Sequence, residues 1–268
     1  MSGGADSCGL ALLAAAAGLT GTLHHVDHGL RATSGSEAEV VAALARRLSM
    51  AFVAHTAIVA DGPNLEARAR AARHAALPAG ALTGHTMDDQ AETVLLNVLR
   101  GAGLDGLAAM APSTKPLLGL RRHELRALVA AQGVDVVVDS SNFDLSLKRN
   151  LLRARVLPEL NRVAARDLVP ILARQATLAR DVVAYLDEAA HEAVLDESDV
   201  AALRDAHPVL RRRRLRDLAR DADVAAHPPS AAEVDRMEGV VLGEATATEL
   251  SGGRRLARRR GRLRLEDG

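Results

Sequence analysis

Residues 2 to 7 of the chain read Ser-Gly-Gly-Ala-Asp-Ser, and an apolar run with helical composition follows over residues 10–17. Two adjacent glycines let the backbone approach an oxyanion closely, and Ser2 and Ser7 add hydroxyl donors. The N–H groups at the start of a helix also attract phosphate. Because no Gly-Lys-Ser/Thr closes the loop, it is not the Walker-type P-loop. The stretch predicts a different phosphate cradle, with an ordinary glycine turn before a helix as the alternative.

The composition excludes several classes of protein. A chain of 268 residues is long enough for one large or two modest domains. Its single cysteine, Cys8, excludes a disulfide framework, and no apolar run is long enough to span a bilayer. The N-terminus lacks the features of a secretory signal, so we expect a cytoplasmic protein without a membrane partner. Aromatic residues make up only 1% of the chain, so nucleic acid would be bound mainly through charge.

Short apolar runs alternate with helical patterns up to about residue 140. The runs are brief, apolar and flanked by polar or turn residues, as buried strands are, and they cover residues 22–26, 51–58, 81–84 and 134–138. The helical patterns cover residues 37–49, 64–76, 88–100 and 122–132. This alternation predicts an α/β fold with a doubly wound parallel sheet, whose ligands bind at the carboxyl ends of the strands.

The second half of the chain has a different character. Residues 150–220 have helical patterns rich in leucine, alanine and arginine, and residues 248–265 suggest a small hairpin. We therefore expect an α/β domain over residues 1–145 and a smaller, mainly helical domain over residues 146–268. Although the formal net charge is zero, residues 254–264 hold seven arginines and no acid. With Arg211 to Arg214, they suggest positive patches for a phosphate backbone, and solvated helix faces are the alternative.

Two polar motifs follow predicted strands. Residues 25–31 read His-Val-Asp-His-Gly-Leu-Arg, which suits adenosine contacts better than a metal because a third ligand is not evident. The stretch 84–93 contains the adjacent carboxylates Asp88 and Asp89. Hard oxygen ligands beside a triphosphate are what Mg²⁺ prefers. Helix capping by the same carboxylates is the alternative, and the two roles are compatible.

Further motifs stand in a fixed order along the chain, at residues 25–31, 64–70, 84–93, 99–103, 115–118 and 139–150. Together with the opening hexamer, they resemble the tRNA(Ile)-lysidine synthase family of PP-loop ATP pyrophosphatases from residue 2 to about residue 160. The resemblance implies an ATP- and Mg²⁺-dependent ligase. In this family ATP adenylates the wobble cytidine of the CAU-anticodon isoleucine tRNA, and free L-lysine then displaces AMP from C2 of the base.

The resemblance also implies roles for individual residues. ATP would be bound by Ser2, Gly3, Gly4, Ala5, Asp6, Ser7, His28, His85 and Asp89. Asp6 and Asp89 would hold the metal, and Asp6, Arg100 and Asp139 would be catalytic. The tRNA phosphates would be bound by Arg149, Asn150 and Arg153. For each arginine the alternative is an ion pair on a helix surface, and for Asp139 it is a helix cap.

Two departures from the family pattern leave other hypotheses open. A hydrophobic strand usually precedes the Ser-Gly-Gly motif, whereas only Met1 stands here, so we expect a first strand to be lacking and the chain to be truncated. Residues 139–142 read Asp-Ser-Ser-Asn in place of Asp-Pro-Ser-Asn. A catalytically impaired tRNA-binding remnant or another PP-loop adenylating enzyme are the alternatives. Thiolating relatives that need paired cysteines are disfavoured. A homodimer stays open.

Overall fold

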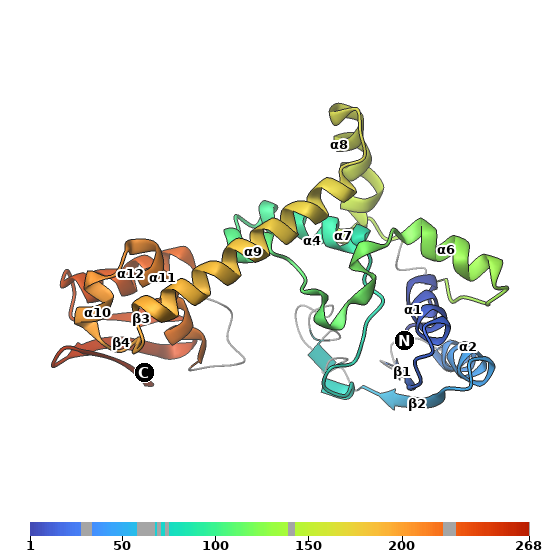
Figure 1. Cartoon of the computed structure of the whole chain (residues 1–268), viewed down its shortest axis with the longest axis horizontal. Helices are drawn as coiled ribbons and strands as arrows, with labels where there is room; N and C mark the ends of the chain where they lie inside the picture. The colour runs from blue at the N-terminus through green and yellow to red at the C-terminus, as the bar shows by residue number, and fades with distance from the viewer. Residues whose placement is uncertain are drawn as a thin grey trace. The chain divides into compact units, whose positions relative to one another are not determined.

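A computed structural model describes residues 1–27, 34–57, 68, 71–72, 75–138, 143–221 and 229–267. The chain forms two compact units, Met1–Arg180 and Asp181–Gly268 (Figure 1). The predicted functional boundary at residue 145 is a different division of the chain, and it stays a prediction. Within the described residues, no helix is both long enough and apolar enough to cross a membrane.

The first unit begins with an α/β arrangement. Helix α1 (Ala5–Ala16) is followed by strand β1 (Thr22–Asp27), helix α2 (Ser34–Arg47) and strand β2 (Ala51–Thr56). The two strands are parallel, with Leu23 opposite Phe52, as expected for strands joined through a helix. Both helices bury an apolar face, and a core cluster joins Cys8, Ala11, Leu12, Leu23, Val41, Leu44, Ala45 and Val129. The strands predicted at residues 22–26 and 51–58 are confirmed, the second ending at Thr56.

The strands predicted at residues 81–84 and 134–138 were wrong, because neither segment forms a ladder. Val137 donates its backbone N–H to the Gly3 carbonyl over 3.0 Å, and the Met1 amino group donates to the His24 carbonyl. Residues 1–3 therefore lie between β1 and the segment 134–138, and they offer too few peptide groups for a ladder. In the segment 81–84, the Thr83 N–H is bonded instead to the Thr114 carbonyl.

The other regular elements described in the first unit are helical. They are α4 (Met87–Leu99), α5 (Leu104–Leu107), α6 (Arg122–Ala131), α7 (Lys148–Leu151), α8 (Leu157–Ala164) and the first half of α9 (Val169–Ala193). Two 3₁₀ turns (Pro112–Thr114 and Pro116–Gly119) lie before α6, and a π-helical turn (Leu152–Val156) joins α7 to α8. The helices predicted at residues 10–17, 37–49, 88–100 and 122–132 are confirmed. Most of the helix predicted at residues 64–76 lies outside the described residues.

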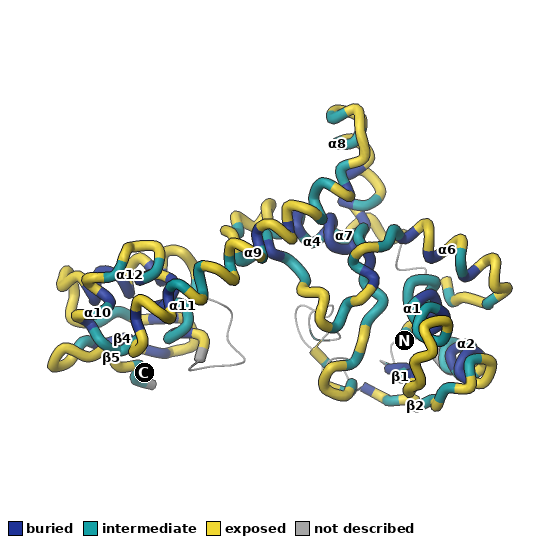
Figure 2. The backbone as a smooth tube through the Cα atoms, in the orientation of Figure 1, coloured by how far each residue is buried: buried dark blue, intermediate teal, exposed yellow. Residues whose placement is uncertain are grey.

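The second unit packs helices on a small antiparallel sheet. Its helices are the end of α9, α10 (Val200–Asp205), α11 (Pro208–Asp221) and α12 (Ala231–Leu242), and its strands are β3 (Ala247–Leu250), β4 (Arg254–Arg259) and β5 (Arg262–Asp267). The strand order is β3-β4-β5, so the predicted C-terminal hairpin is confirmed within a three-stranded sheet. Leu203, Leu215, Met237 and Leu256 are fully buried in its core. Buried stretches of the backbone are dark blue in Figure 2.

Three of the arginines predicted to form a positive patch on α11 are buried in ion pairs instead. Arg211 lies 2.7 Å from Glu238 Oε1, and both side chains are 8% exposed. Arg213 pairs with Asp187, and Arg214 pairs with Glu197. That part of the prediction was wrong, because acidic residues far away in sequence neutralise these guanidinium groups when the unit folds. A buried charge must be paired, so these arginines contribute to the packing of the unit.

Replacing Glu238 by alanine is expected to destabilise the second unit by about 3–5 kcal/mol, because it leaves the Arg211 guanidinium buried without its carboxylate. Urea unfolding followed by far-ultraviolet circular dichroism measures the change. Glu159→Ala is the matched control, because Glu159 forms an exposed pair with Arg162 on α8, and it should leave the unfolding midpoint unchanged. Equal losses in the two variants would show that burial of the pair is unimportant.

Candidate active site

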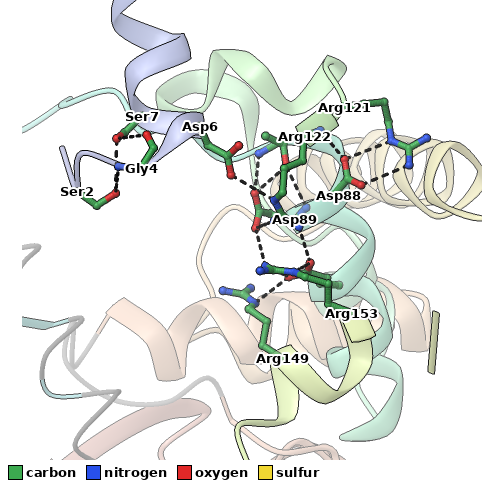
Figure 3. Close-up of polar contacts among 12 residues, drawn as sticks. Ser2, Gly4, Asp6, Ser7, Asp88, Asp89, Arg121, Arg122, Arg149 and Arg153 are labelled. Atoms are coloured by element: carbon green, nitrogen blue, oxygen red, sulfur yellow. Dashed lines mark hydrogen bonds and ion pairs between the residues drawn. The ribbon is translucent and has the colours of Figure 1, made fainter. Parts of the chain in front are cut away.

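The opening hexamer forms a turn that leads directly into α1. Gly3 has a φ of +71°, and a Cβ at this position would lie 2.7 Å from Val137 Cγ2, so only glycine fits. Gly4 is the N-cap of α1, and its N–H donates to Ser2 Oγ over 3.4 Å. Ser7 Oγ donates to the Gly4 carbonyl over 3.0 Å (Figure 3). The loop is thus held in shape by its own side chains, while the first N–H groups of α1 lack intrahelical acceptors.

This loop opens onto a cavity of about 1530 Å³ within the first unit. The cavity reaches Val26 and Asp27 at the carboxyl end of β1, where ligands bind in α/β folds. Polar side chains from α4, α6, α7 and the π-helical turn after α7 also line it, namely Asp89, Arg122, Arg149, Asn150 and Arg153. A cavity of this size accommodates a nucleotide together with part of a second substrate.

The segment before α4 passes close to the start of α1. A Cβ on Gly84 would lie 2.6 Å from the backbone oxygen of Asp6, so the two backbones approach more closely than any other residue allows. The next residue, His85, lines the cavity and shares a hydrogen bond of 2.8 Å with Thr83 Oγ1. The close approach of Gly84 to Asp6 sets the distance between the phosphate loop and the carboxylates of α4.

Helix α4 begins with a capping box that orients Asp89. Thr86 is the N-cap, and Asp89 Oδ2 accepts hydrogen bonds of 2.8 Å from both the Thr86 N–H and the Thr86 hydroxyl. The capping alternative for Asp89 is therefore confirmed. Capping uses only Oδ2, which leaves Oδ1 turned toward a cationic partner. One carboxylate can thus serve the helix and the site at once.

That partner is Arg122, the first residue of α6. Its Nε lies 3.2 Å from Asp6 Oδ2, its Nη2 lies 2.6 Å from Asp89 Oδ1, and its Nη1 lies 3.1 Å from Glu92 Oε1 (Figure 3). The guanidinium side chain is only 10% exposed. Despite the burial, the surrounding carboxylates raise the pKa of Arg122 above its ordinary value, so the group stays charged. One side chain thus links the starts of α1, α4 and α6.

Three more ion pairs extend the network. Arg121, the N-cap of α6, has its Nε 3.2 Å from Asp88 Oδ2, so adjacent acids of α4 pair with adjacent arginines at the start of α6. Glu92 is 1% exposed and accepts two hydrogen bonds from Arg153, of 2.7 and 3.0 Å. Arg149 Nε lies 3.5 Å from the same carboxylate. Carboxylates and guanidinium groups are therefore paired in the cavity wall and in the layer of residues directly behind it.

The two carboxylates predicted to bind metal differ in their electrostatics. Burial raises the pKa of Asp6, although Arg122 opposes that shift. Burial also acts on Asp89, but the Arg122 charge and the Thr86 hydrogen bonds hold the pKa of that carboxyl below its usual value. Asp6 Oδ1 is buried and has no hydrogen-bond partner among the described residues. An orphaned carboxylate oxygen beside the phosphate loop fits a hard divalent cation.

No group of three or more His, Cys, Asp or Glu side chains in the described residues could hold a metal ion without other ligands. A cation at Asp6 and Asp89 would complete its shell with water and phosphate oxygens. Mg²⁺ is commonly held in this way beside a nucleotide, through one or two carboxylates. The donor set therefore fits Mg²⁺ better than zinc.

The structure gathers most of the residues predicted for the site, and the cavity wall includes Ser2, Gly4, Ala5, Asp6, Ser7, His85, Asp89, Arg149, Asn150 and Arg153. Asn150 is buried, and its amide donates to the Asp144 carbonyl over 2.9 Å. Arg100 is not among these residues, because it caps the C-terminal end of α4, opposite to Asp89. His28 and Asp139 lie outside the described residues.

Sequence reasoning missed Arg122 and the role of Glu92. Arg122 stands next to Arg121 at the start of an amphipathic helix, where a surface position is the ordinary interpretation. One signal could have pointed to such an arginine. Carboxylates that gather in one buried site require cations nearby to neutralise them. Glu92 stands one helical turn after Asp88 and Asp89, so it belongs to the same face as these carboxylates.

Comparisons with known proteins agree with this geometry. Residues 1–160 match the family model of the PP-loop domain, so the first unit contains the nucleotide-binding fold of the PP-loop ATP-using proteins. The U34-tRNA thiolase NcsA from Methanococcus maripaludis shares the fold, with a TM-score of 0.55 and 15% identity over 67% of this chain and 71% of that one.

Curated relatives narrow the class. The tRNA(Ile)-lysidine synthase of Salinispora tropica is 40% identical over 301 aligned positions, which cover 99% of this chain and 89% of that protein. The tRNA(Ile)-lysidine synthase of Thermobifida fusca is 37% identical, covering 90% of this chain and 81% of its own length. The chain belongs to the tRNA(Ile)-lysidine synthase family.

Gly84→Ala is expected to lower ATP affinity by on the order of tenfold, because the added Cβ forces the segment 81–84 away from Asp6. Isothermal titration calorimetry with a non-hydrolysable ATP analogue measures the change. Gly119→Ala is the control, since a Cβ there meets nothing within 4 Å. Equal affinity in the two variants would show that the close approach has no role in nucleotide binding.

Proposed function

We propose that this chain is a tRNA(Ile)-lysidine synthase, which uses ATP to attach L-lysine to C2 of the wobble cytidine in the CAU-anticodon isoleucine tRNA. The observation that carries the proposal is the meeting of the phosphate loop with Asp6 and Asp89 on one cavity wall. The names of the Salinispora and Thermobifida relatives support the same reaction and the same tRNA.

The proposed reaction has two steps. The C2 oxygen of the cytidine attacks the α-phosphorus of ATP, the bond to the β-phosphate bridging oxygen breaks, and pyrophosphate leaves. An amine of lysine then attacks C2, the bond from C2 to the AMP oxygen breaks, and a proton is released. Both leaving groups are phosphates, so a site that binds oxyanions suits both steps.

Different residues of the cavity would take different parts in these two steps. The hexamer loop and the N-terminus of α1 would hold the ATP phosphates through N–H and hydroxyl groups. Asp6 and Asp89 would hold Mg²⁺, which neutralises charge on the departing pyrophosphate when it is bound. Arg122 is close enough to both carboxylates to keep them in position before ATP arrives. His85 would line the nucleotide edge. The catalytic roles of Arg100 and Asp139 stay predictions.

We place the tRNA contacts nearest to the chemistry at Arg149 and Arg153, which line the cavity and are 29% and 31% exposed. Both could turn from Glu92 to a phosphate of the tRNA. Asn150 would orient this segment from its buried position. In the second unit, Arg260 and Arg264 are exposed near the β4–β5 turn and add positive charge for a polyanion. The reaction uses ATP and tRNA, from which we infer a cytoplasmic protein. A homodimer stays a hypothesis that light scattering would test.

The purified protein is expected to release AMP and pyrophosphate in sustained turnover only when CAU-anticodon tRNA, ATP, Mg²⁺ and lysine are all present. Radiolabelled lysine should enter the tRNA. Incorporation of sulfur or ammonia would identify a different PP-loop enzyme. Binding of tRNA without ATP binding or pyrophosphate release would identify a catalytically impaired remnant.

Asp6→Asn is expected to lower adenylation by at least about a hundredfold with nearly unchanged tRNA affinity, because Asp6 would contact the metal and the ATP phosphates, whereas the proposed tRNA contacts are made by Arg149 and Arg153. Pyrophosphate release and filter binding measure the two effects. Asp105→Asn, on α5 and outside the cavity wall, is the control. Wild-type adenylation in Asp6→Asn would leave Asp6 with a purely structural role.

A further inference from the structure

Arg122 is the shared partner of two carboxylates of the cavity wall, Asp6 and Asp89, and of the buried Glu92. Each of its three nitrogens faces a different acid, Asp6 on α1 and Asp89 and Glu92 on α4. Arg121, its neighbour in sequence, pairs with Asp88 and Asp167 outside this cluster. The position of Arg122 between the proposed metal ligands is therefore specific to this side chain.

The oxygens of Asp89 are both engaged. Oδ2 accepts from the Thr86 N–H and hydroxyl, and Oδ1 lies 2.6 Å from Arg122 Nη2. Asp6 is engaged at Oδ2 by Arg122 Nε, and only its Oδ1 lacks a hydrogen-bond partner. A divalent cation that binds both carboxylates must therefore take an oxygen from the guanidinium or share it.

The charges in the cluster already balance. The carboxylates of Asp6, Asp89 and Glu92 face the guanidinium groups of Arg122, Arg149 and Arg153, which is three charges of each sign. A divalent cation that enters this neutral, largely buried cluster gains little net attraction and lies beside a positive guanidinium. The triphosphate of ATP makes the cluster more favourable for a cation, because its oxygens add negative charge. They can also accept hydrogen bonds from the guanidinium that the metal displaces.

We propose that Arg122 is a positioning residue that occupies the metal-binding oxygens of Asp6 and Asp89 in the nucleotide-free protein and turns to the ATP phosphates when the metal enters. The proposal rests on the proposed function, since it assumes that these carboxylates bind the catalytic metal. Its consequence is coupled binding: free metal binds weakly, and metal and ATP strengthen each other.

Two measurements on Arg122→Gln test the proposal without relying on activity. Mn²⁺ titrated into nucleotide-free protein, with free Mn²⁺ followed by electron paramagnetic resonance, should bind about tenfold more tightly than in the wild type, because the competing cation is gone. A fluorescent ATP analogue titrated in EDTA should bind about tenfold more weakly, because the phosphates lose a guanidinium. A merely structural role for Arg122 would weaken both.

The control is Arg46→Gln, which removes the same charge from the last turn of α2, where the side chain is exposed and lies outside the cavity wall. It should change either affinity by less than about twofold. Arg122→Lys keeps the charge but cannot face three carboxylates at once, so it should shift both affinities in the same directions by smaller factors. This variant decides the question if Arg122→Gln does not fold.

The possible outcomes separate the two proposals. Tighter Mn²⁺ binding together with weaker ATP binding in Arg122→Gln supports the positioning role, and unchanged or weaker Mn²⁺ binding overturns it. Asp6→Asn, introduced alone, should abolish Mn²⁺ binding, so that all added Mn²⁺ stays free. If Mn²⁺ binding is insensitive to Asp6→Asn, the metal site itself is wrong, and the positioning role fails with it.

Discussion

The charge balance around Arg122 is the constraint on which the site depends. A guanidinium that is 10% exposed cannot stay ionised in a protein interior unless carboxylates surround it, and those carboxylates cannot be buried together without a cation. The three acids come from the starts of two helices, and Arg122 begins a third. The phosphate loop, the capping box at Thr86 and the start of α6 are therefore held in one arrangement. Loss of any member would leave a charge uncompensated and would loosen the others.

Much of the fold and site could be predicted from local patterns. The hexamer, the helix periods and the individual motifs each depend on residues close together in sequence, and they led to the correct family. Most of the site residues predicted from them line the cavity. The strands at 81–84 and 134–138 failed, because a ladder depends on a neighbouring strand as well as on apolar composition. Arg122 was missed for a related reason. It meets Asp6 across a sequence separation of 116 residues, and no periodicity reports such a pair.

The arginines of the second unit illustrate the same limit. Composition suggested polyanion binding for all of them, yet Arg211 and Arg254 are buried and hold carbonyl oxygens or carboxylates inside the unit. Arg260 and Arg264 remain exposed on the β4–β5 hairpin. Within β4, the alternation of side chains decides which arginine is buried. Arg254 and Arg255 point to opposite faces of the strand, and only Arg254 is buried. An aromatic-poor chain uses arginine both as an internal cross-link and as surface charge, and only the fold distinguishes these uses.

The close approach of Gly84 to the Asp6 backbone has a consequence for how this gene can vary. Every amino acid other than glycine carries a Cβ, so any missense change in this codon brings an atom to within about 2.6 Å of a carbonyl oxygen at the catalytic loop. Only synonymous changes of the Gly84 codon keep this contact, unless α1 shifts at the same time. Natural variation at this position is therefore expected to be silent, and a replacement there in a clinical or environmental isolate would indicate a compensating change elsewhere in the loop.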